Sequence, residues 1–111
     1  MIRDRDSLLD ILEQIELIQN HGPADESELE ADVVQQAATL HWIQTIGEAA
    51  ARISPELLAR TPDVPWREIV DMRNLVVHSY DQVDLAIVWQ VLERDLPALE
   101  PRIREILASL S

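Results

Sequence analysis

The sequence predicts an all-α fold, an antiparallel bundle of four main helices plus one short helix. Aliphatic residues recur at steps of three and four along most of the chain, which is the spacing of one helix face. No segment shows a strand-like alternation of useful length, and only 2 glycines are available for hairpin turns. Because 111 residues suffice for one hydrophobic core, we expect a single domain over residues 1–111.

Two helices are predicted in the first half of the chain. The first runs from Asp6 to Gln19 and stops at Gly22-Pro23, because glycine suits the residue past a helix end and proline cannot continue a helix. The second is expected to run without interruption from about Ser27 to Ile53, with Ser27 as its N-cap and Glu30 completing a capping box. The small residues around Gly47 would let another helix approach this one closely.

The second half contains the short helix and the remaining main helices. Ser54-Pro55 has the cap-then-proline order of a helix start, Pro65 is expected at a first helical position, and Asp84 is expected to cap a later helix. Pro97 is expected to interrupt the last helical stretch. The predicted helices run from Pro55 to about Arg60, from Trp66 to about His78, from Leu85 to Arg94 and from Ala98 to Leu110.

The charge balance is strongly acidic. The formal net charge is -12, from 21 acidic and 9 basic residues, and every basic residue is an arginine. This argues against sequence-independent binding of nucleic acid, which relies on a basic face, and we expect no DNA partner. A proposal that the protein acts on RNA must therefore explain how an acidic protein binds a polyanion.

The composition also bears on the compartment. The sequence lacks cysteine, which excludes a disulfide framework, thiolate catalysis and thiol-based zinc sites. The first residues lack an apolar signal core, and no segment approaches the roughly 20 apolar residues of a membrane span. We therefore expect a soluble, cytoplasmic protein with no membrane partner.

One segment carries polar groups that a bundle does not need for packing: Arg73, Asn74, His78 and Tyr80, threaded through an aliphatic stretch. On a regular helix Asn74 and His78 share one face, and Arg73 and Tyr80 share another. Arg73 and His78 are about 140° apart at 3.6 residues per turn. A joint site for that pair needs the helix to loosen near His78, or a second subunit that brings the two faces together.

Such side chains could cleave a phosphodiester without a metal. A histidine titrates near neutrality and can take the proton from a ribose 2′-hydroxyl or return one to the leaving oxygen. An arginine stabilises the negative charge that builds on phosphorus, and an asparagine could hold the imidazole or a phosphate oxygen. The sequence implies no cofactor and no metal cage, because His21, His41 and His78 are scattered and no carboxylate pair sits beside them at ligand spacing.

The same residues have a structural interpretation. An Arg-Asn-His cluster at a helix end is more often a capping or buried hydrogen-bond network than a catalytic site. The tryptophans could stack RNA bases or serve in packing. Because the chain has no Phe and only one Tyr, we take Trp66 and Trp89 as core or interface residues and Trp42 as a subunit contact.

Several short motifs occur together and in order: Asp10-Ile11, Ile46-Gly47-Glu48-Ala49, Pro62, Pro65-Trp66, Met72-Arg73-Asn74, His78-Ser79-Tyr80, and Val83-Asp84 with Trp89. From about Arg5 to Leu99 the chain thereby resembles the HepT-like branch of the HEPN superfamily. Separate motifs in this order are far more specific than the spacing of Arg73 and His78 alone.

The resemblance implies an all-helical, HEPN-like homodimer that acts as a metal-independent endoribonuclease toxin. Arg73 and His78 match the catalytic pair of the family, in a cleft between two subunits that cleaves RNA, with tRNA as one candidate substrate. Asn74 matches the polar residue that commonly follows the arginine, and Glu48 is expected to pair with Arg73 or to make a helix contact. Tyr80 matches the tyrosine that the cognate antitoxin, a minimal nucleotidyltransferase of the MntA type, modifies with AMP.

The chain departs from the family pattern in two places. Asp81-Gln82 follow the tyrosine where relatives often carry an aromatic residue and a glycine, and Leu29 stands where an aromatic residue is common. These changes bear on substrate access and activity rather than on the fold. A second function stays open, that of a non-catalytic helical dimer that docks and regulates a nucleotidyltransferase.

Overall fold

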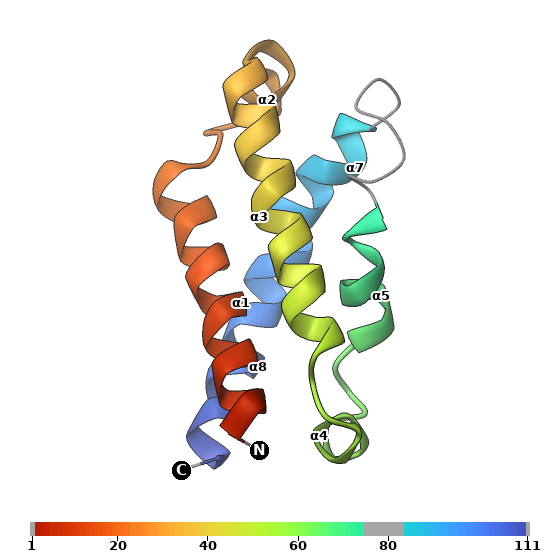
Figure 1. The fold of residues 1–111 in the computed structure, drawn as a ribbon. Helices are drawn as coiled ribbons and strands as arrows, with labels where there is room; N and C mark the ends of the chain where they lie inside the picture. Colours follow the sequence, from red (N-terminus) through yellow and green to blue (C-terminus); the bar gives the residue numbers. More distant parts are fainter. Residues whose placement is uncertain (1, 75–83, 111) are drawn as a thin grey trace.

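The computed structural model describes residues 2–74 and 84–110, and within them every regular element is a helix. Four helical segments run up, down, up and down in the bundle, which confirms the predicted antiparallel arrangement (Figure 1). They are α1 (Ile2–His21), α3 (Val33–Ala51), α5 (Trp66–Asp71), and the run of α7 (Leu85–Gln90), η2 (Val91–Asp95) and α8 (Leu96–Ser109). Two short helices, α2 (Glu26–Ala31) and α4 (Pro55–Arg60), lie at opposite ends of the bundle. In these parts of the chain, no helix combines the length and apolar character that a membrane crossing requires.

The first helix, α1, extends past both predicted ends. Its inward face carries the buried apolar residues at the predicted spacing, from Leu8 to Ile15. The amide of Gly22 donates to the carbonyl of Ile18 at 2.8 Å and ends the helix. A Cβ at Gly22 would lie 2.4 Å from that carbonyl oxygen, so the glycine is needed at this stop.

The prediction of one uninterrupted helix from Ser27 to Ile53 is wrong, because the helix is interrupted at Asp32. Asp32 is extended, with φ -114 and ψ 106, and its carboxylate accepts hydrogen bonds from the amides two and three residues later at 2.9 and 3.2 Å. The N-cap of α2 is Asp25, not Ser27. An aspartate can satisfy free amides at a new helix start, and here this local bonding prevails over the apolar periodicity that suggested one helix.

Two of the expected helix starts are confirmed and one is shifted. Ser54 caps α4, accepting from the amide three residues later at 3.2 Å, and Asp84 caps α7, accepting from the amide two residues later at 2.9 Å. Pro65 occupies the N-cap position of α5, and the first helical residue is Trp66. Proline suits both positions, because neither amide is needed inside the helix.

The interruption expected at Pro97 is a π-helical segment, not a break. Helix continues from α7 through η2 into α8, and the amide of Leu96 donates to the carbonyl of Val91, five residues back. Pro97 then lies in the first turn of α8. A proline lacks the amide that a continuous α-helix requires and clashes with the carbonyl four residues earlier, and a wider π turn just before it accommodates that conflict.

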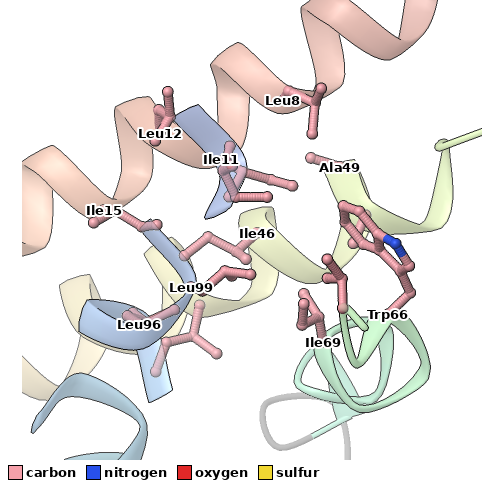
Figure 2. Packing of buried hydrophobic residues seen from close by; sticks show 14 of the residues in the cluster. Leu8, Ile11, Leu12, Ile15, Ile46, Ala49, Trp66, Ile69, Leu96 and Leu99 are labelled. Atoms are coloured by element: carbon pink, nitrogen blue, oxygen red, sulfur yellow. The ribbon is translucent and has the colours of Figure 1, made fainter. Parts of the chain in front are cut away.

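Side chains from α1, α3, α5 and α8 converge on one hydrophobic cluster (Figure 2). Trp66 is 7% exposed in this cluster, and its indole Nε1 donates to the hydroxyl of Thr61 at 2.9 Å. Trp89 is partly buried against the same cluster, so both tryptophans pack as predicted. Trp42 is partly exposed on α3, and its expected subunit contact stays a prediction.

Two polar contacts hold the chain between α3 and α5 against the other helices. Asp4, which is 1% exposed on α1, accepts from the amide and hydroxyl of Ser54 at 2.8 and 2.6 Å. Asp63 accepts two hydrogen bonds from Arg102 of α8, at 2.7 and 3.1 Å. These bonds hold the pKa of the Asp63 carboxyl below its ordinary value. The connection between α3 and α5 is therefore anchored at two points, to α1 through Ser54 and to α8 through Asp63.

Candidate functional site

Arg73 and Asn74 lie just beyond α5, where the helix geometry changes. The regular α-helix ends at Asp71, and the amide of Met72 is shared between the carbonyls three and four residues back, at 3.1 and 3.2 Å. The amide of Arg73 donates only to the carbonyl of Val70, three residues back, at 3.3 Å. Both Arg73 and Asn74 are exposed, so their polar groups can reach a solvent-borne ligand.

The other side of this segment packs directly on α3. A Cβ at Gly47 would lie 3.0 Å from both the Cβ and the amide nitrogen of Arg73, and 3.2 Å from the carbonyl oxygen of Ile69. This confirms that the small residues around Gly47 let another helix approach closely. The residue that approaches Gly47 is Arg73, which carries the candidate catalytic guanidinium. The apolar periodicity could not identify this contact.

Glu48 follows Gly47 on α3 and is exposed. Its carboxylate accepts a hydrogen bond from the side-chain amide of Gln44, one turn earlier, at 3.3 Å. Among the ion pairs of residues 2–74 and 84–110, none joins Glu48 to Arg73. The expected role of Glu48 beside the arginine stays a prediction.

Arg73 also lines an open hollow over α3, α4 and α5, whose wall includes Ala50, Leu58 and Trp66. Arg67 lines the same hollow, and sequence reasoning missed it because an arginine on an exposed helix face carries no signal of its own. Within the described residues neither guanidinium is ion-paired, whereas those of Arg52, Arg102 and Arg104 are held by carboxylates.

The local charge differs from that of the whole chain. Asp63, Glu68 and Asp71 line the hollow with Arg67 and Arg73, so acidic and basic groups nearly balance there. Over the whole chain the acids outnumber the arginines by more than two to one. Two guanidiniums that have no ion-pair partner among the described residues, in nearly neutral surroundings, can each offer a planar donor pair to a phosphate.

Part of the predicted site lies outside the described residues. Residues 75–83 are outside the described part of the chain, and they include His78, Tyr80 and the unusual Asp81-Gln82. Their convergence with Arg73 and Asn74 is therefore a prediction. Of the other histidines, His41 on α3 and His21 at the end of α1 are both exposed.

The fold and the site define an all-α bundle protein with a candidate anion site centred on an arginine at a helix end. A model of the ribonuclease HepT-like family matches residues 11–106. The chain belongs to this family, which confirms the resemblance drawn from the motifs.

Named relatives agree with the family. A protein of Thermococcus cleftensis named "Probable ribonuclease HepT" is 31% identical over 103 residues, which cover 92% of this chain and 94% of that protein. A Methanocaldococcus jannaschii protein named "Gamma-glutamylcyclotransferase and putative RNase" is 33% identical over 101 residues, 90% of this chain. The match covers only 46% of that second relative's length. No solved structure matches the chain.

Proposed function

We propose that this chain is a metal-independent endoribonuclease toxin that cleaves RNA at a composite site formed by two copies of the chain. The family membership supports a ribonuclease. The observation that carries the proposal is the exposed guanidinium of Arg73, which has no ion-pair partner among the described residues. By the resemblance of its motif, Arg73 matches the family's catalytic arginine. A capping residue or a buried network would have its donors engaged.

In the proposed reaction a ribose 2′-hydroxyl attacks the adjacent phosphorus. His78 takes the proton from that hydroxyl, the new oxygen–phosphorus bond forms, and the bond to the 5′-oxygen breaks with proton return to the leaving oxygen. Arg73 stabilises the extra negative charge on the phosphoryl oxygens. Asn74 holds the imidazole or a phosphate oxygen, and Glu48 orients the arginine.

A dimer would also resolve the charge problem. If RNA, such as tRNA, enters only a narrow cleft lined by Arg73 of both copies, the remaining surface can be acidic. An acidic surface disfavours non-specific RNA and suits a dedicated protein partner. We propose that this partner is a minimal nucleotidyltransferase antitoxin that transfers AMP to Tyr80.

The cleavage assay incubates the purified protein with total RNA or tRNA in the presence of a chelator. His78→Ala and Arg73→Ala are each expected to slow cleavage by roughly 100- to 10,000-fold, the range for loss of a general acid–base or charge-stabilising group. His41→Ala, which alters an exposed histidine elsewhere on the bundle, is the matched control and should cleave like the wild type. Equal cleavage by all variants would indicate a contaminant, and an inert wild type would favour the non-catalytic docking module.

The same assay tests the silencing step. Preincubation with the nucleotidyltransferase and ATP is expected to abolish cleavage by the wild type and to add mass in multiples of AMP. Tyr80→Phe should keep its cleavage activity and gain no mass. A Tyr80→Phe protein that is still silenced and still gains mass would remove Tyr80 from this role.

A further inference from the structure

The end of α5 is held weakly by its own helix. A regular α-helix would join the amide of Arg73 to the carbonyl of Ile69, but that amide bonds to Val70 instead. The bond is 3.3 Å long, beyond the usual range of about 2.7–3.2 Å. Local hydrogen bonding therefore fixes the backbone at Arg73 less firmly than inside α5, and a tertiary contact can help to set its position.

That contact is the backbone of α3 at Gly47. Gly47 is buried, and a Cβ built on it would meet Arg73 at 3.0 Å, well inside the optimal carbon–carbon separation of about 3.5–4.0 Å. The same Cβ would meet the Ile69 carbonyl oxygen at 3.2 Å. The lack of a side chain at this one position lets Arg73 sit directly on α3.

The two residues that a Cβ at Gly47 would contact, Ile69 and Arg73, differ in how easily they can be displaced. Ile69 is 2% exposed and belongs to the close-packed core, where displacement costs packing energy (Figure 2). Arg73 lies at the exposed end of the helix, beyond the last regular hydrogen bond. A side chain added at Gly47 would therefore displace mainly Arg73.

We propose that Gly47 is a positioning residue for Arg73, setting where the guanidinium meets the scissile phosphate. This inference rests on the proposed ribonuclease function. The added Cβ calls for a shift of a few tenths of an ångström, and because a displacement of about 1 Å in a catalytic group can cost on the order of 100-fold in rate, we expect a smaller loss here. Arg73 also meets phosphate in the bound substrate, but its strongest interaction is with the charge that develops in the transition state, so the loss should appear mainly in kcat, with a smaller rise in KM.

The test compares Gly47→Ala with Ala49→Val. Ala49 lies two residues further along α3, is fully buried in the same core, and would be overpacked by the larger side chain (Figure 2). Both variants are expected to lose some stability. At a temperature where both are folded by circular dichroism, Gly47→Ala should show a roughly 3- to 10-fold lower kcat, whereas Ala49→Val should match the wild type.

A structural readout accompanies the rates. The backbone amide resonance of Arg73 should shift in Gly47→Ala and stay in place in Ala49→Val. If Gly47→Ala alone does not fold, the comparison of all three proteins is repeated in an osmolyte that favours the compact state, such as trimethylamine N-oxide. An active wild type with an unimpaired, folded Gly47→Ala variant overturns this inference alone. An inert wild type overturns the proposed function and this inference with it.

Discussion

The indole of Trp66 shows how a single buried donor is satisfied in this core. Its Nε1 donates to Thr61, and the Thr61 hydroxyl donates onward to the carbonyl of Leu57 at 2.7 Å. All three groups lie where α4 turns toward α5. Because a buried donor without an acceptor loses its hydration and gains nothing in return, this chain of bonds should matter to stability.

We predict that Thr61→Val lowers the free energy of unfolding by about 1–3 kcal/mol, because it leaves the indole N–H buried and unpaired. Urea denaturation followed by tryptophan fluorescence measures the loss. Thr45→Val is the matched control, since that hydroxyl bonds only to the carbonyl of His41 one turn earlier on the same helix, and it should cost less than about 0.5 kcal/mol. Equal losses in the two variants would contradict the role assigned to the indole bond.

The break between α2 and α3 results from the capping of α3 by one residue, Asp32. Asp32 closes α2 and opens α3, with its carboxylate bonded to two amides of the new first turn. Asp95 lies at the junction of η2 and α8, inside a continuous helix, and its side chain makes no capping bond there. Replacement of Asp95 therefore removes a helical carboxylate without removing a capping bond.

At the element scale, Asp32→Ala is expected to lower the free energy of unfolding by about 0.5–2 kcal/mol, the usual cost of losing an N-cap. Asp95→Ala should change it by only a few tenths of a kcal/mol. Chemical denaturation measures both. A neutral Asp32→Ala accompanied by a gain in helical circular dichroism would mean that α2 and α3 fuse into one helix, as the apolar periodicity alone suggests.

Over the whole molecule, the acidic charge limits how RNA can be engaged. Of the arginines in the described part of the chain, only Arg67 and Arg73 line the hollow beside the candidate site. Two copies would then neutralise at most four phosphates. Broad contact along an RNA strand would require a basic face, and the sequence offers 9 arginines against 21 acids.

We therefore predict a shallow salt dependence of RNA binding by the proposed dimer. With about 0.7 counterions released per phosphate of a single strand, the slope of log binding constant against log salt should not exceed roughly 3 in magnitude. Titration of labelled RNA with His78→Ala protein at several salt concentrations measures this slope without cleavage. A slope twice as steep would reveal phosphate contacts beyond these arginines.

The candidate site was only partly predictable from the sequence. The motif identified Arg73 and Asn74, and the structure shows both exposed at a helix end that loosens just before them. Arg67 was missed, because its place in the same hollow depends on how α3 and α4 pack around α5. His78 and Tyr80 lie outside the described residues and remain predictions from the motif.

The order of amino acids was enough to predict the helical class, the antiparallel bundle, the core faces and the caps at Ser54 and Asp84. These features depend on neighbours three or four residues apart, which a sequence displays directly. The contact of Gly47 with Arg73 and the bond between Asp4 and Ser54 became visible only in the folded bundle. Such contacts depend on the relative height and rotation of packed helices, which local periodicity does not specify.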